Sequence, residues 1–281
     1  MFVTCNAPAK RRLFVATVGV SDYKDSTMNL KYADDDARAI EAAFKQSGTL
    51  YDEVVTVGML TDATATKANV LALNAKLKET TADDTVVLFF AGHGVLDRTS
   101  KDFYFATHDM DFNAPSKLGL SMEALIGLFN GVSARQRIMF LDACHSGELD
   151  DSQAIELLSK PVGEGIRSSS VRKPRVAIGL NKSFQYMQQM FSDLNRGVGA
   201  HIIAAAAGLE YAYEKDGQGT FTKAVLEALN NPRTATRPRD MGQLRVSSLR
   251  DYVYRRVSSL TGGAQVPTSR QENLTLDFRL R

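Results

Sequence analysis

Apolar positions along the chain fall into two patterns that alternate. Continuous apolar runs, typical of strands that are buried on both faces of a sheet, cover residues 13–20, 54–60, 85–91, 138–143 and 201–207. Apolar residues at helical spacing predict helices over 30–44, 68–77, 122–129, 222–229 and 246–260. Alternating Phe and Tyr predict a small hairpin at 102–107. The order predicts an α/β fold, with a mostly parallel central sheet and helices on both faces.

Two of the predicted strands lead into side chains that can do chemistry. Residues 85–91 are followed by Gly-His-Gly, which contains His93, and residues 138–143 are followed by Cys144 in an expected tight polar turn. The carboxyl ends of parallel strands meet at one edge of a sheet, so we expect the imidazole and the thiol to lie close together. A thiol with a pKa near 8.5 becomes a good nucleophile when a histidine stabilises its thiolate. The pair predicts a Cys-His nucleophile.

The residues around this pair resemble a known family. Asp142-Ala-Cys-His-Ser-Gly147, with His93-Gly94 about 50 residues upstream, resembles the caspase-like cysteine peptidases, in particular their bacterial, metacaspase-type (orthocaspase-like) branch. Further similarity lies in 13–22, 30–37 and the segment Gly219-Thr-Phe-Thr222. The resemblance implies a caspase-like fold, a cysteine endopeptidase, and an oxyanion hole made by the backbone N–H groups of Gly94 and Cys144.

Acidic residues near the predicted nucleophile bear on specificity. Asp142 stands where caspases that cut after aspartate carry Gln, and a carboxylate there favours Arg or Lys in the substrate. On the helix at 30–44, a 100° step per residue places Asp36 closest to the apolar face and Asp35 opposite it. Asp34 and Asp35 are equally well explained by the helix dipole. The metacaspase-type pattern also uses acids at the positions of Asp36 and Asp142.

Two further segments hold candidate site residues: an acidic segment that would line the substrate cleft, and a long insert that would be cleaved. Residues 208–214 resemble the loop that lines the family's substrate cleft, where Glu210 or Glu214 would contribute. We expect a tail at 1–12 and one peptidase domain at 13–281, with an insert or linker at about 148–199. The insert is rich in Gly, Ser and basic residues and lies where caspases carry a cleaved linker. Arg167, Arg172 and Arg175 are therefore candidate self-cleavage sites, and a solvated basic loop that is never cut is the equal alternative.

Composition excludes several other functions. The formal net charge of +2, with dispersed Lys and Arg, argues against nucleic acid as a partner. No apolar run approaches the roughly 20 residues that cross a bilayer, and the first residues do not resemble a signal peptide, so we expect a cytoplasmic protein without a membrane partner. Cys5 and Cys144 are expected to be free thiols, since a disulfide would consume the nucleophile.

Neither a metal nor an organic cofactor is expected. His93, Cys144 and His145 are too few ligands for a zinc site. Calcium dependence, known in some metacaspases, stays open but unsupported, because Ca²⁺ takes six to eight oxygens and the acids after the histidine are scattered. Those acids are Asp97, Asp102, Asp109, Asp111, Asp150 and Asp151.

The preferred hypothesis is a cysteine endopeptidase that cleaves proteins or peptides after Arg or Lys. A catalytically silent caspase-like scaffold is the main alternative, although it would require neither the dyad nor the acidic pair. A thiol acyltransferase or small-molecule hydrolase is a third reading, which an acidic pocket does little to favour. The abrupt opening on the first predicted strand also leaves room for further domains, or for regulators of the same pathway.

Overall fold

The structure is a computed structural model of the chain. It describes residues 10–46, 50–97, 100, 102–145, 199–205, 214–215, 217–263, 265–271 and 276–281. Apart from Gly199, the insert predicted at 148–199 lies outside these residues.

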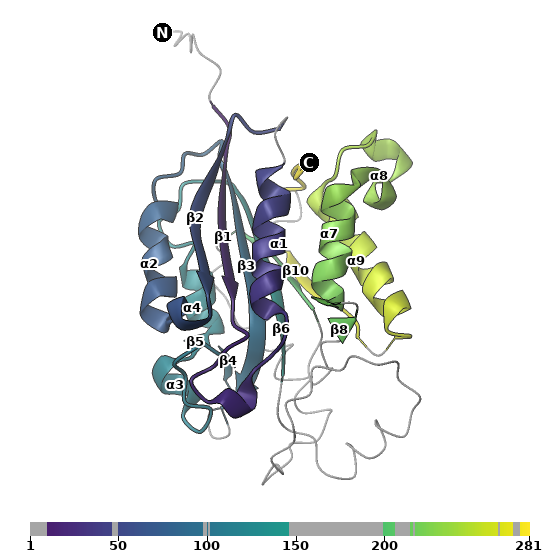
Figure 1. Cartoon of the computed structure of the whole chain (residues 1–281). Helices are drawn as coiled ribbons and strands as arrows, with labels where there is room; N and C mark the ends of the chain where they lie inside the picture. Colours follow the sequence, from purple (N-terminus) through teal and green to yellow (C-terminus); the bar gives the residue numbers. More distant parts are fainter. Residues whose placement is uncertain are drawn as a thin grey trace, which may run out of the picture.

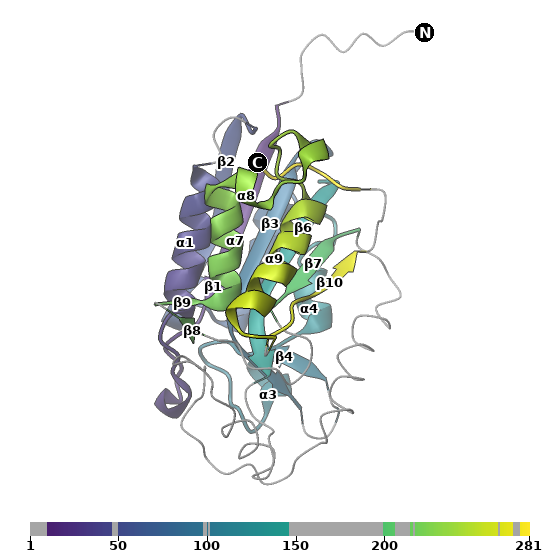
Figure 2. The same ribbon diagram turned by 90° about the vertical axis from the view of Figure 1, so that its right-hand side faces the viewer.

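A central sheet runs through the molecule, with strand order β10-β7-β6-β3-β1-β2 (Figures 1 and 2). Its strands are β1 (Arg12–Gly19), β2 (Glu53–Thr61), β3 (Thr85–Leu96), β6 (Gln136–His145), β7 (His201–Ala204) and β10 (Thr268–Gln271). All neighbouring pairs are parallel except β10 with β7. The predicted mostly parallel sheet is therefore confirmed, and the antiparallel edge strand β10 is an addition that the apolar pattern does not predict.

Helices cover both faces of the sheet, as predicted (Figures 1 and 2). One face carries α1 (Ala33–Lys45), α7 (Thr220–Asn230), α8 (Pro232–Ala235) and α9 (Val246–Leu260). The other carries α2 (Lys67–Leu77), α3 (Pro115–Leu118) and α4 (Met122–Gly127). The described residues also form the short 3-10 helices η1 (Ser26–Met28), η2 (Asp62–Thr64) and η3 (Pro238–Asp240). In the described part of the chain, no helix combines the length and the apolar character that a membrane crossing requires.

Each face of the sheet has its own apolar core, because successive strand residues point to opposite faces. In β3, Val86, Leu88 and Phe90 pack into the core beneath α2 and α4. Val87, Phe89 and Ala91 pack into the core beneath α1, α7 and α9. Burial on both faces explains why the central strands read as unbroken apolar runs in the sequence.

The structure corrects two predicted strand ends and one predicted hairpin at the carboxyl edge of the sheet. The expected tight turn at Cys144 is wrong, because β6 continues through Cys144 to His145. Strand β3 likewise continues past Ala91, and its last residues pair with β4 (Phe103–Phe105). The expected hairpin at 102–107 is therefore wrong: β4 pairs with β3 and with β5 (Leu120–Ser121) in an antiparallel extension. Pairing with strands from elsewhere in the chain extends these segments beyond their apolar runs.

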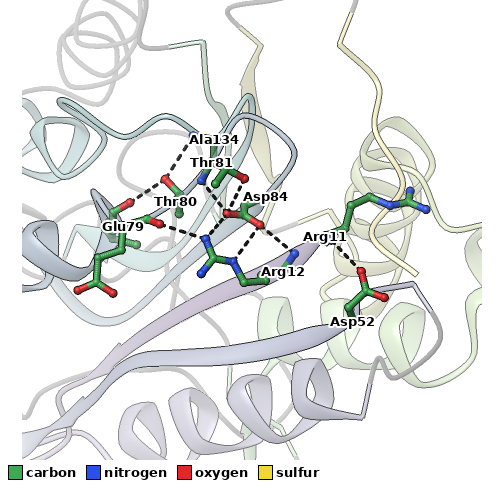
Figure 3. Close-up of polar contacts among 9 residues, drawn as sticks. Arg11, Arg12, Asp52, Glu79, Thr80, Thr81, Asp84 and Ala134 are labelled. Carbon is green, nitrogen blue, oxygen red and sulfur yellow. Dashed lines mark hydrogen bonds and ion pairs between the residues drawn. The ribbon is translucent and has the colours of Figure 1, made fainter. Parts of the chain in front are cut away.

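At the opposite edge of the sheet, an ion pair fastens the starts of β1 and β3 (Figure 3). Asp84 is fully buried and accepts hydrogen bonds from the Arg12 side chain at 2.8 and 3.3 Å and from the Arg12 backbone N–H at 2.9 Å. The backbone and hydroxyl of Thr81 donate to the same carboxylate at 2.7 and 3.0 Å. Burial alone would raise the pKa of Asp84, but the hydrogen bonds from Arg12 and Thr81 outweigh it and hold the pKa below its ordinary value.

Candidate active site

His93 and Cys144 lie side by side on neighbouring strands. In the parallel pairing of β3 with β6, His93 is the register partner of Cys144, and Gly94 is the partner of His145. Adjacent strands in a sheet are separated by about 4.8 Å, so the two backbones lie within side-chain reach of each other. The structure describes the backbone of Cys144 and not its side chain.

The His93 imidazole is held by a backbone carbonyl. Its Nε2 lies 2.8 Å from the carbonyl oxygen of Met28. A carbonyl oxygen can only accept, so Nε2 carries a proton and Nδ1 is the ring nitrogen that can take one up. Met28 closes the short helix η1, whose N-cap Asp25 accepts hydrogen bonds from the backbone and the hydroxyl of Thr27. A well-capped turn therefore sets the tautomer of the histidine.

Aromatic rings surround the imidazole, and His93 is only 3% exposed. The Tyr23 ring lies 5.2 Å from the imidazole centroid, and the Phe112 ring meets it edge-on at 5.9 Å. The backbone N–H of His93 donates to the Tyr23 hydroxyl at 2.9 Å. A Cβ at Gly92 would lie 2.9 Å from that hydroxyl oxygen, so a side chain there would disturb the contact. Tyr23 therefore orders both the backbone and the ring of His93.

Asp36 and Asp142 both contact the N-terminus of α7. Asp36 accepts from the backbone N–H of Gly219, the N-cap residue of α7, at 3.2 and 3.3 Å. The Thr222 hydroxyl donates to Asp142 at 2.7 Å. The positive end of a helix dipole favours carboxylates. Two acids from separate elements, α1 and β6, thus meet within the first turn of α7.

The helical geometry of α1 sorts its three aspartates as the sequence predicts. Asp36 is fully buried, whereas Asp35 is exposed and Asp34 is half-buried. Asp34 and Asp35 both form ion pairs with Arg38 on the surface of the helix. Asp142 is also fully buried, so neither acid of the expected substrate pocket reaches the surface here.

Several predicted site residues lie outside the described residues. These are Glu210 and the candidate self-cleavage residues Arg167, Arg172 and Arg175. Glu214 is described only by its backbone, which lies in the short strand β8 (Glu214–Lys215) paired with β9 (Gln218–Gly219). Gly94 lies between His145 on β6 and Phe105 on β4. Within the described residues, no three His, Cys, Asp or Glu side chains cluster as a metal site.

The structure adds residues to the site that the sequence reasoning missed. Met28 acts through its carbonyl oxygen, which every residue type has, so no sequence signal could reveal it. Tyr23 lies in an irregular loop after β1, far from His93 in the sequence. Gly219 and Thr222 belong to the Gly-Thr-Phe-Thr segment, which resembles the family in sequence, but nothing in the sequence predicts its contact with the two acids.

Comparisons with known proteins agree with this architecture. The family model described as Caspase domain matches residues 13–279. Among solved structures, protein GSU0716 from Geobacter sulfurreducens is similar, with a TM-score of 0.59 and 17% identity over 92% of each chain. At that identity, the likeness shows a shared fold and nothing about activity. Among curated protein sequences, none matches significantly.

Proposed function

Because the chain belongs to the caspase-domain family of cysteine peptidases, we propose that it is a cysteine endopeptidase in which His93 activates Cys144. The observation that carries the proposal is the register of the sheet, which pairs His93 with Cys144 across adjacent strands. A nucleophile and its base must lie within hydrogen-bond reach of each other, and side chains at paired positions can meet that condition. The Met28 carbonyl supplies the third group that orients the base.

The proposed reaction follows from the tautomer of His93. Its Nδ1 takes the proton of the Cys144 thiol, and the Met28 carbonyl stabilises the imidazolium through Nε2–H. The thiolate adds to the carbonyl carbon of the substrate, and the backbone N–H groups of Gly94 and Cys144 are the proposed donors to the resulting oxyanion. The imidazolium then protonates the leaving amine as the C–N bond breaks. Water hydrolyses the acyl-enzyme and restores the thiol.

The proposed specificity is for Arg or Lys before the cleaved bond. Asp36 and Asp142 supply two carboxylates that face the same helix end, and Asp142 lies two residues before Cys144. Carboxylates removed from water pair more strongly with an entering guanidinium, which can also bond bidentately. Because both acids are buried in the structure, the substrate side chain must open a path to them. An aspartate in the same place would be repelled.

Turnover of fluorogenic peptides that differ only in the residue before the scissile bond tests this function. We expect the peptides with Arg or Lys to be cleaved and the peptide with Asp to be left intact. Cys144→Ala and His93→Ala should abolish cleavage while circular dichroism shows a folded protein. Full turnover by the folded Cys144→Ala protein would rule out the nucleophile, whereas efficient cleavage of the Asp peptide by the wild type would rule out the acidic pocket.

We also propose that the enzyme cuts its own chain between residues 160 and 180. Arg167, Arg172 and Arg175 match the proposed specificity and lie in a Gly- and Ser-rich segment, whereas Lys173 precedes Pro174 and is a poor site. Mass spectrometry of purified wild-type protein should detect a new N-terminus near Ser168. The Cys144→Ala chain should stay whole. An intact wild-type chain, under conditions in which peptides are cleaved, would show that the segment serves another purpose.

A further inference from the structure

A hollow lies outside the candidate active site, on the face of the sheet that α7 and α9 cover. Its walls are charged, aromatic and apolar. Its volume is about 510 Å³, within the range of roughly 300–1,000 Å³ that is typical of small-molecule sites. It lies between α9 and the edge strand β10, which run close together in Figure 2. Arg237, which immediately precedes η3, contributes a further wall. The residues of the proposed mechanism take no part in its lining.

One wall of the hollow concentrates positive charge. Among the described residues, Arg237, Arg250 and Arg255 line it together with one carboxylate, Asp251, so two positive charges are in excess. Arg237 forms an ion pair with one oxygen of Asp251, and Arg250 donates to the other at 2.9 and 3.0 Å. Arg255 donates its Nε to the backbone carbonyl of Asp251 at 3.2 Å. Asp251 thus contacts three guanidinium groups, two through its carboxylate and one through its backbone carbonyl.

These bonds leave donors available for a ligand. A guanidinium has five N–H groups, and the bonds of Arg237 and Arg255 described above use one nitrogen of each. Arg255 is exposed, and no carboxylate in the described part of the chain lies within ion-pair distance of it. Forked N–H donors of this kind match the oxygens of a phosphate group.

The other walls suit a planar ring. Tyr254 is 50% exposed and lies one residue before Arg255 on α9. Ile203 and Pro267 are buried and give the hollow an apolar part. Exposed aromatic rings are platforms on which nucleobases stack, and the hydroxyls of Thr268 and Ser269 can bond to polar edges.

From this combination we propose that the hollow binds a nucleotide. The phosphates would lie against Arg237 and Arg255, and the base would lie against Tyr254. An inorganic anion would use only the basic wall, and a nucleoside would use only the aromatic one. The proposal concerns a second site, and it does not depend on the chain being a peptidase.

The proposal can be tested by isothermal titration calorimetry of the full chain with ADP, adenosine and pyrophosphate. EDTA in the buffer removes divalent cations. We expect saturable binding of ADP that is tighter than binding of either fragment. Arg255→Gln should weaken ADP binding about tenfold, the effect of one lost charge-assisted hydrogen bond. Arg233→Gln, which changes an exposed arginine of α8 outside the hollow, should leave the affinity unchanged.

A second variant separates the two walls. Tyr254→Ala should weaken ADP binding and leave pyrophosphate binding as it is. Because Tyr254 is exposed, its replacement should leave the fold intact. The proposal is overturned if ADP does not saturate the protein, or if Arg255→Gln and Tyr254→Ala both bind ADP like the wild type. Pyrophosphate binding as tightly as ADP would reduce the site to a simple anion site and overturn the nucleotide assignment.

Discussion

The environment of a single residue, His93, carries most of what the proposed chemistry needs. A base must present the correct nitrogen, and the Met28 carbonyl assigns that nitrogen by accepting from Nε2. The base must also keep its place, and Tyr23 contacts both its ring and its backbone N–H. Tyr23 is a positioning residue in this view, since it acts on the reaction through His93.

Removing the Tyr23 hydroxyl should make the position of His93 less well ordered while the imidazole itself is kept. In Tyr23→Phe the buried N–H of His93 loses its acceptor, which costs about 1–3 kcal/mol. We expect kcat on an Arg peptide to fall about tenfold with KM nearly unchanged, and the rate of Cys144 alkylation by iodoacetamide at neutral pH to fall with it.

Tyr104→Phe is the matched control for that variant. Tyr104 lies half-buried on β4, and its hydroxyl makes no hydrogen bond to any residue that the structure describes. Its removal should change neither rate. Equal kinetics for Tyr23→Phe and the wild type would show that the contact between Tyr23 and His93 is dispensable.

At the scale of elements, α7 organises the proposed substrate pocket. Its first turn receives Asp36 from α1 through Gly219 and Asp142 from β6 through Thr222. The start of α7 therefore contacts two carboxylates that are far apart in the sequence. The Gly-Thr-Phe-Thr segment is thereby explained as the part of α7 that holds both acids.

Changing Thr222 should therefore alter substrate binding at Asp142. Thr222→Val keeps the shape of the side chain and removes the hydroxyl that donates to Asp142, so the buried carboxylate loses a strong hydrogen bond. We expect kcat/KM for Arg peptides to fall about tenfold, mainly through KM. Thr222→Ser should restore it.

Thr220→Val tests whether any buried threonine in this turn has the same effect. Thr220 is 3% exposed, and its hydroxyl bonds to no described residue. Its replacement should leave kcat/KM unchanged. A loss of activity in Thr222→Val that Thr222→Ser does not restore would contradict the role assigned to the hydroxyl.

At the scale of the whole molecule, the two ends of the parallel strands differ in function. We call the side of the sheet where these strands begin the amino edge and the side where they end the carboxyl edge. The carboxyl edge carries His93 and Cys144, while the amino edge is fastened by Asp84 and Arg12 (Figure 3). Strands β1 and β3 run in parallel from the amino edge to the carboxyl edge, so the ion pair fixes the start of β3, the strand that carries His93 near its other end. The ion pair that stabilises the fold and the candidate catalytic residues therefore lie at opposite ends of the strands.

Asp84→Asn should destabilise the fold by about 3 kcal/mol, because it removes the buried charge that Arg12 and Thr81 surround. Urea unfolding at pH 7 measures the effect. Asp35→Asn, at an exposed aspartate that pairs with Arg38, is the control and should change stability by less than about 0.5 kcal/mol.

The pH dependence of stability in Asp84→Asn tests the depressed pKa of Asp84. The folded-state pKa of Asp84 lies below its ordinary value, so its stabilising contribution is fully present above about pH 4, the unfolded value. It is lost as the pH falls through the folded pKa. The gap in stability between the wild type and Asp84→Asn should be constant from pH 7 to 5 and should narrow below about pH 4. A gap that stays constant under acid would contradict the depressed pKa.

The sequence by itself determined the layered fold and the pairing of the two candidate catalytic residues. Strands buried on both faces must be apolar throughout, and amphipathic helices must repeat every three to four residues, so both patterns are local. Since parallel strands end at one edge, His93 and Cys144 could be placed together without coordinates. The inward position of Asp36 followed in the same way from the helical repeat.

Only the tertiary structure decided how those residues are supported. The Met28 carbonyl and the Tyr23 hydroxyl come from the connection between β1 and α1, which holds a loop and the short helix η1. The path of this connection depends on contacts such as that of Tyr23 with His93, which are distant in the sequence. The lengths of β3 and β6 and the presence of β10 depend on pairing with other strands, which a local apolar pattern does not encode. The convergence of Asp36 and Asp142 on α7 has the same cause, because a buried carboxylate takes its partners from whichever elements pack against it.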